Sequence, residues 1–286
     1  MIYSKPVREV IRQRFSCRTY LDKPIPEEKR KRLADFISSV KTGPFGTPVR
    51  FELVAATEGD RKSLKGLGTY GFIKGAAGFI VGAAGHSKMN LEDFGYSLER
   101  IILFATDIKL GTCWLGGSFT RSRFAKKISA AGGELLPAVS SIGYIADKDR
   151  SGVTIRQLVG GHHRRPWEDL FFQNRFGGSV SPDEAGEYAE PLEMVRIGPS
   201  ASNKQPWRII KDGNAWHFYM QRTKGYGNSL TFKLLRLADL QRVDMGIAMS
   251  HFELTARELN LKGKWDISEP EIEKPDKLTE YIASWK

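Results

Sequence analysis

The spacing of apolar residues along the chain predicts helices and strands in two successive series. From Pro26 onward the apolar positions recur with the period of a helix, and four of them share one face: Leu33, Phe36, Ile37 and Val40. A proline followed by two glutamates favours a helix start at this point. A longer helix is predicted over residues 90–109, with six apolar positions on its core face: Leu91, Phe94, Leu98, Ile101, Ile102 and Ala105.

The same reasoning predicts the remaining elements. In the first half we expect short helices at residues 7–14 and 121–128, and strands at residues 50–55, 78–82 and 138–144. In the second half we expect a helix with Ser181 as N-cap, strands at residues 207–211, 215–221 and 262–267, a long helix at residues 239–259 and a final helix that closes near Trp285. Helices and strands are mixed within each half, which predicts an α+β fold.

Glycine-rich segments mark the middle of the chain. Residues 160–167 and 176–179 combine glycines with a Pro-Trp pair and predict a hinge-like region. We therefore expect a first unit at residues 1–172 and a second, shorter unit at residues 173–286.

The two predicted units share residues at a constant offset. Five residues of the first half recur 151 positions later: Asp93, Gly95, Ala105, Leu110 and Trp114 match Asp244, Gly246, Ala256, Leu261 and Trp265. Gly43-Pro44 also matches Gly198-Pro199, at an offset of 155. One shared offset with several identities indicates an internal duplication, to which chance matches are the alternative. A duplicated unit would mimic a two-fold dimer, so we expect a monomer with internal pseudo-two-fold symmetry.

The net charge of the chain limits the classes of molecule that it is expected to bind. The chain has 286 residues, 41% of them hydrophobic, a formal net charge of +11 and a pI of about 9.6. Such a charge suits nucleic acid, acidic lipids or a phosphorylated small molecule. The basic residues are scattered and not interleaved with aromatics, so we expect a solvated basic surface and no nucleic-acid partner. A nucleic-acid binder is kept as a rival hypothesis, which would bind generic duplex with a steep salt dependence.

The apolar runs and the cysteines indicate in which cellular compartment the protein is expected. The longest apolar run, residues 76–84, is far shorter than the roughly 20 residues that span a bilayer, so we expect no membrane partner. The N-terminal residues carry no apolar signal core. Cys17 and Cys113 form no zinc pattern and fit free thiols in a reducing cytosol. We therefore expect a cytoplasmic protein without a metal site.

Two segments carry residues suited to binding a polar ligand. In Arg14-Phe-Ser16-Cys-Arg18, alternation along an extended chain places two guanidiniums and a hydroxyl on one side, which suits a phosphate. A surface salt-bridge segment is the alternative. In Pro199-Ser-Ala-Ser-Asn203-Lys-Gln-Pro-Trp207, two prolines pin a loop that offers N–H groups, a hydroxyl and a carboxamide. A plain helix-to-strand turn is the alternative.

Two weaker segments add to these. Gly111-Thr-Cys-Trp-Leu115-Gly116-Gly117 could bring bare backbone amides against a ring, or could simply end a helix. Arg164-Arg165, before Pro-Trp, supplies either further positive charge or ordinary surface.

Taken in order, these motifs resemble those of the FMN-dependent nitroreductase family in its fused, single-chain form, the TM-nitroreductase type. The resemblance spans nearly the whole chain and implies a nitroreductase-like fold. Residues 14–18 resemble the family's Arg-x-Ser-x-Arg segment, which holds the FMN phosphate and ribityl. Residues 199–207 are similar to its PSxxNxQPW loop, which touches the flavin. Residues 110–117 resemble the loop near flavin N5, and residues 164–170 resemble the basic segment that closes on the phosphate.

The resemblance implies thirteen cofactor-binding residues. They are Arg14, Phe15, Ser16, Arg18, Leu115, Gly116, Gly117, Arg164, Arg165, Pro199, Ser200, Ala201 and Asn203. It also implies that NADH or NADPH donates hydride to FMN, which passes it to an electron-poor small molecule such as a nitroaromatic or quinone. No protein side chain is then needed as a catalyst, because the cofactor carries the redox chemistry. A flavin-binding or flavin-free protein of the same fold, without nitroreductase activity, is the alternative.

The sequence departs from the family pattern in a way that predicts a split site. The first half has Gly43-Pro-Phe-Gly-Thr-Pro48 where the Ser/Asn loop should be, and the second half has residues 173–179 where RxSxR should be. Each half therefore keeps one component. Combining residues 14–18 with residues 199–203 restores one complete site, so we expect one FMN per chain, between the halves, and loss of the mirror-related site.

Overall fold

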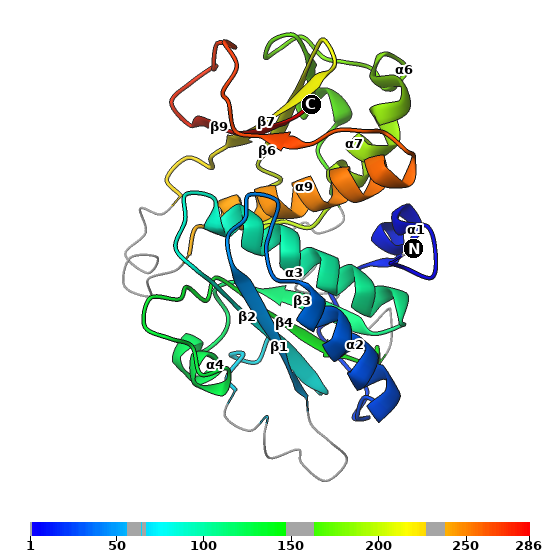
Figure 1. Ribbon diagram of the computed structural model, residues 1–286, viewed down its shortest axis with the longest axis vertical. Coiled ribbons are helices and arrows are strands. Elements are labelled where there is room, and N and C mark those ends of the chain that lie inside the picture. Colours follow the sequence, from blue (N-terminus) through cyan, green and yellow to red (C-terminus); the bar gives the residue numbers. More distant parts are fainter. Residues whose placement is uncertain (1, 56–63, 65–66, 147–162, 227–237) are drawn as a thin grey trace.

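The computed structural model describes residues 2–55, 64, 67–146, 163–226 and 238–286 (Figure 1). Two β-sheets lie at opposite ends of the molecule, and two long helices pack against each other between them. These helices are α3 (Asn90–Asp107) and α9 (Leu240–Glu258), both close to their predicted bounds. The side chain of Asp239 caps α9 by accepting hydrogen bonds from the first backbone N–H groups of the helix.

The first sheet is antiparallel, with the strand order β1-β2-β4-β3. Its strands are β1 (Val49–Ala55), β2 (Gly78–Ala84), β3 (Gly111–Leu115) and β4 (Val139–Gly143). The surrounding helices are α1 (Val7–Gln13), α2 (Glu27–Ser39) and α4 (Arg121–Lys127). Helices α2 and α3 pack on one face of the sheet and α4 on the other. Every residue of β2 is buried, which explains why this strand is a continuous apolar run.

The second sheet repeats this strand order. Its order is β5-β6-β7-β9-β8, in which the short β5 is parallel to β6 and the other pairs are antiparallel. The strands are β5 (Phe171–Gln173), β6 (Trp207–Asp212), β7 (Ala215–Gln221), β8 (Trp265–Asp266) and β9 (Thr279–Trp285). Without β5, the order β6-β7-β9-β8 reproduces β1-β2-β4-β3, and α9 follows β7 as α3 follows β2. The two sheets therefore fit two tandem units of one α+β plan.

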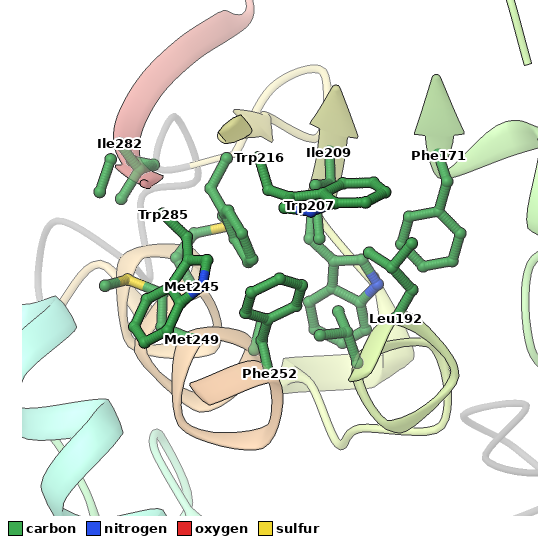
Figure 2. Packing of buried hydrophobic residues seen from close by; sticks show 14 of the residues in the cluster. Phe171, Leu192, Trp207, Ile209, Trp216, Met245, Met249, Phe252, Ile282 and Trp285 are labelled. Atoms are coloured by element: carbon green, nitrogen blue, oxygen red, sulfur yellow. The ribbon is translucent and has the colours of Figure 1, made fainter. Parts of the chain in front are cut away.

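The second core lies between this sheet and α9. Figure 2 shows three tryptophans of the sheet, Trp207, Trp216 and Trp285, facing Phe252 and the methionines of α9. Between β5 and the strands of the second core, the chain forms the helices α6 (Pro182–Ala185), η3 (Gly186–Tyr188) and α7 (Ala189–Arg196). The predicted N-cap is confirmed, because Ser181 and Glu184 form a reciprocal capping box.

Three sequence-based expectations differ from the structure. The final helix predicted near Trp285 is wrong: residues 279–285 form β9, which lies between β7 and β8 and pairs with both. Much of the segment at residues 110–117, which the resemblance identified as a loop, is β3, and the strand predicted over residues 262–267 shortens to β8. Strand partners elsewhere in the chain decide these segments, and local patterns do not register such partners. The expected unit boundary at 172/173 falls within β5, and residues 160–162 of the hinge-like segment lie outside the described residues.

Two glycines let α3 and α9 approach closely. A Cβ atom on Gly95 would lie 2.1 Å from the carbonyl oxygen of Val243, and one on Gly246 would lie 2.0 Å from that of Glu92. Gly95 matches Gly246 and Glu92 matches Val243 at the offset of 151, so the two contacts are equivalent. Such reciprocal contacts are what a two-fold axis produces. Residues that match at the 151-residue offset in the sequence therefore make equivalent contacts in the structure.

Candidate active site

A cavity of about 1160 Å³ lies between the halves, where β3, α9, residues 14–18 (the N-terminal arm) and residues 199–207 (the second-half loop) meet. Twelve of the thirteen predicted site residues line it: Arg14, Phe15, Ser16, Arg18, Leu115, Gly116, Gly117, Arg164, Pro199, Ser200, Ala201 and Asn203. Arg165 does not; its backbone N–H donates to Gln205 Oε1 at 2.8 Å and the residue is exposed. The fold therefore brings together segments about 185 residues apart.

The N-terminal arm lies alongside β3 as a short parallel strand. Ser16 forms a bridge with Thr112, and the Cys17 N–H donates to the Thr112 carbonyl at 2.8 Å. The predicted alternation follows, because Arg14, Ser16 and Arg18 line the cavity while Cys17 is fully buried. Burial raises the pKa of the Cys17 thiol to about 11, so the thiol is protonated at neutral pH and is a poor nucleophile.

The cavity is strongly cationic. Its described lining includes Arg12, Arg14, Arg18, Arg164 and Lys204, against the single carboxylate of Asp244. The Nε of Arg14 and the Nη1 of Arg18 are buried and have no hydrogen-bond partner among the described residues. Buried donors without partners are rare in folded proteins, and charged ones are unfavourable unless an anion is close. These two nitrogens therefore suit an anionic group of a ligand.

The second-half loop is held by α9. The Ala201 N–H donates to the Asp244 carboxylate, with its nitrogen 2.9 and 3.1 Å from the two oxygens, and the Gln205 N–H donates to Ser200 Oγ at 2.9 Å. Burial raises the pKa of Asp244 well above its ordinary value, and the Ala201 N–H opposes this shift. Three non-glycine residues adopt positive φ: Ser202 (50°), Asn203 (53°) and Gln205 (49°). Backbone strain of this kind is typical of functional loops.

Asn203 lines the cavity and also holds a neighbouring segment of the protein. Its Oδ1 accepts a hydrogen bond from Arg164 Nη1 at 2.7 Å, and its Nδ2 donates to the His163 carbonyl at 2.8 Å. A second hydrogen bond joins Arg164 Nη2 to the Ile197 carbonyl at 3.0 Å. Asn203 therefore holds the Arg164 segment at the edge of the cavity.

Gly116 marks a close approach at the end of β3. A Cβ atom there would lie 2.4 and 2.7 Å from the two methyl carbons of Leu240, the first residue of α9. Only a residue without a Cβ fits beside Leu240 here, and residues 115–117 line the cavity at this point.

Several cavity residues were not selected from the sequence. Asp244 and Trp114 belong to the repeated pattern, so the duplication was the signal that could have identified them. Leu240, Val243 and Ile247 come from the helix that crosses from the second half, and their apolar character gave no indication of a site.

A smaller cavity of about 330 Å³ lies near the mirror-related position. Its lining includes Gly43 and Pro44, which match Gly198 and Pro199, and Trp265, which matches Trp114. Tyr96 stands where the large cavity has Ile247, and its hydroxyl donates to Glu253 Oε2 at 2.9 Å. Trp265 Nε1 donates to the same oxygen at 2.7 Å. Tyr96, which is larger than Ile247 and is hydrogen-bonded, therefore occupies space at the second position.

The two sheets, the crossed helices and the cationic cavity define an α+β protein with a site at the junction of two similar units. Residues 6–256 match the family model described as "Putative TM nitroreductase", and the chain belongs to this nitroreductase family of oxidoreductases. Among the described residues, no helix is long and apolar enough to cross a membrane.

One solved structure shows the same fold over nearly the whole chain, and others align with about half of it. A "putative nitroreductase" from Thermotoga maritima MSB8 aligns over 98% of this chain and 93% of its own, with a TM-score of 0.61 and 20% sequence identity. One from Desulfovibrio desulfuricans, solved in complex with FMN, covers 50% of this chain and 88% of its own, with a TM-score of 0.40 and 21% identity. A "Putative NADH Oxidase" from Clostridium acetobutylicum covers 49% and 89%, with a TM-score of 0.40 and 25% identity. No curated protein matches the sequence.

Proposed function

We propose that the protein is an FMN-dependent oxidoreductase that passes hydride from NADH or NADPH to an electron-poor small molecule, such as a nitroaromatic or quinone. The observation that carries the proposal is a large cavity lined by Arg14 and Arg18, in which Arg14 Nε and Arg18 Nη1 are buried and have no hydrogen-bond partner among the described residues. The family and the FMN complex of a relative support it. When bound, FMN supplies the hydride chemistry, and the protein supplies binding and orientation.

Different segments of the chain would bind different parts of FMN. Arg14, Ser16 and Arg18 of the N-terminal arm would hold the phosphate and ribityl, because two guanidiniums and a hydroxyl match phosphate oxygens. Residues 115–117 would lie beside the ring, and α9 would cover it with Val243 and Ile247. Apolar walls exclude water and strengthen the electrostatic contacts inside.

We propose one such site per chain. Its parts come from both halves: the N-terminal arm from the first, and the second-half loop with residues 199–203 from the second. Arg164 stays at the cavity because Asn203 holds it, so the two halves support each other.

The test is flavin uptake followed by reduction. Apo-protein mixed with FMN should acquire the absorbance band of bound flavin, and NADH or NADPH added without oxygen should bleach it. A protein that cannot take up FMN would refute the proposal. Uptake without bleaching would favour a flavin-binding protein that is not a nitroreductase.

Matched variants locate the site. Arg14→Ala and Asn203→Ala should each raise the Kd for FMN, by about tenfold to a hundredfold for Arg14→Ala, because a charge-assisted hydrogen bond is lost. Gly132→Ala is the control, since a Cβ at this position meets no atom within 4 Å. Normal FMN affinity in both Arg14→Ala and Asn203→Ala would overturn the split site.

A further inference from the structure

Glu99 is a fully buried carboxylate of α3 that lies behind the cavity, where α3 crosses α9. Its Oε2 accepts a hydrogen bond from Trp114 Nε1 at 2.7 Å. Its Oε1 lies 2.9 Å from His251 Nε2 and 3.7 Å from Arg14 Nε. Arg14 and Trp114 both line the cavity, whereas Glu99 does not. One carboxylate therefore contacts two residues of the site from behind.

His251, also fully buried, is a further contact of Glu99. Its Nδ1 lies 2.9 Å from the Met194 carbonyl oxygen, which can only accept, so Nδ1 carries a hydrogen. Its Nε2 lies against Glu99 Oε1, while Trp114 Nε1 donates to Glu99 Oε2, so the two oxygens of the carboxylate are both held in place behind Arg14.

We propose that Glu99 is a positioning residue that orients Arg14 and Trp114 toward the cavity, and that the contact with His251 holds its carboxylate in place. The inference rests on the proposed function, in which Arg14 binds the FMN phosphate. The Arg14 side chain is only 6% exposed, and Glu99 is its ion-pair partner among the described residues. Without that partner, the guanidinium would lose the contact that sets its direction, and binding would have to order it.

The chain provides a matched control on the other long helix. Glu253 accepts from Trp265 Nε1 at 2.7 Å, as Glu99 accepts from Trp114, and it also accepts from the Tyr96 hydroxyl. It lines the small cavity and not the large one. Glu253→Gln therefore makes the same chemical change near the same helix crossing without touching Arg14.

The experiment is a double-mutant cycle on FMN affinity. Glu99→Gln should fold, because a glutamine can accept from Trp114 and donate to a neutral His251. It should raise the Kd for FMN by about tenfold, a usual size for coupled neighbours. In an Arg14→Ala background the same substitution should leave the Kd unchanged, and Glu253→Gln should leave it unchanged in the wild-type background.

Three outcomes would overturn the inference. These are an unchanged Kd in Glu99→Gln, an equal rise in both backgrounds, or an equal rise in Glu253→Gln, since the last two indicate general loosening of the helix pair. If Glu99→Gln melts below the assay temperature, Glu99→Asp, which keeps the charge but withdraws it by one methylene, replaces it in the cycle.

The experiment distinguishes failure of the proposed function from failure of the positioning role of Glu99. If the wild type binds no FMN, that function fails, and the same variants are compared by the rise in Tm that inorganic phosphate produces. A phosphate effect that depends on Glu99 only while Arg14 is present supports the positioning role. Equal phosphate effects, including none, in the wild type and Glu99→Gln overturn it.

Discussion

Two buried aspartates, Asp93 and Asp244, occupy matching positions on the two long helices and hold matching loops. Asp93 accepts from the Phe45 N–H at 2.9 Å through Oδ1 and from the Thr47 N–H at 2.8 Å through Oδ2. Asp244 accepts from the Ala201 N–H with both oxygens. Burial raises the pKa of both carboxyls. The anchor is therefore the same in both halves, although only the second-half loop carries the serine and asparagine of the site.

These contacts predict different effects of Asp→Asn substitution. A folded pKa above the unfolded value of about 3.9 gives stability that is present at low pH and is lost as pH rises through the folded pKa. Asp244→Asn removes this loss, so its free energy of unfolding relative to wild type should increase between pH 4 and pH 7. Urea unfolding at both pH values measures this. A difference that does not change with pH would contradict the raised pKa of Asp244.

Asp93→Asn serves as the comparison. An asparagine at position 93 must turn its NH₂ group toward one of the two backbone N–H groups that Asp93 accepts. We expect a loss of about 1–3 kcal/mol at pH 7, the usual result of leaving a buried group unsatisfied.

At the scale of elements, the crossing of α3 and α9 joins the two halves. The helices approach so closely at Gly95 and Gly246 that a methyl group on either would overlap a backbone carbonyl of the partner helix. Backbone atoms cannot move aside as a flexible side chain can. The crossing also places Glu99 of α3 beside His251 of α9, next to the N-terminal arm.

Gly95→Ala and Gly246→Ala should each lower the free energy of unfolding by about 3 kcal/mol or more, because overpacking exceeds the gain of about 1 kcal/mol in helix propensity. Urea unfolding measures the effect, with Gly132→Ala as the control, which should change stability by no more than about 0.5 kcal/mol. Equal or greater stability in either helix variant would show that the helices are not in this close contact.

At the scale of the whole molecule, the two positions that an internal two-fold would make equivalent differ. One is a cavity of about 1160 Å³ and the other a smaller cavity of about 330 Å³, in which Tyr96 and Trp265 both donate hydrogen bonds to Glu253. A duplicated plan can thus keep its packing while only one position keeps room for a large ligand.

The asymmetry predicts a stoichiometry of one FMN per chain, measured by titration of apo-protein with FMN. Because a ligand that binds only the folded state stabilises it, FMN at a hundred times its Kd should raise Tm by about 5 °C. Two equivalents bound with similar affinity would contradict loss of the mirror-related site.

Much of the fold and the site could be predicted from the sequence. Both long helices, the Ser181 cap and most strands follow from local periodicity and capping residues. Twelve of the thirteen predicted site residues line the large cavity, because motif order identified their segments. Residues 279–285 were misassigned, because a strand between two others depends on partners that lie far away in the sequence.

By itself, the sequence determined the helical and extended segments, the 151-residue offset and the distribution of motif residues between the halves, since these depend on neighbours along the chain. Only the tertiary structure decided which side chains meet. It brings Asn203 into hydrogen-bonding contact with Arg164, and Glu99 into contact with Arg14 and His251. It also places β9 between β7 and β8. The physical reason is that hydrogen bonds, ion pairs and strand pairing act over a few ångströms in space. Folding brings residues within that range regardless of their separation along the chain.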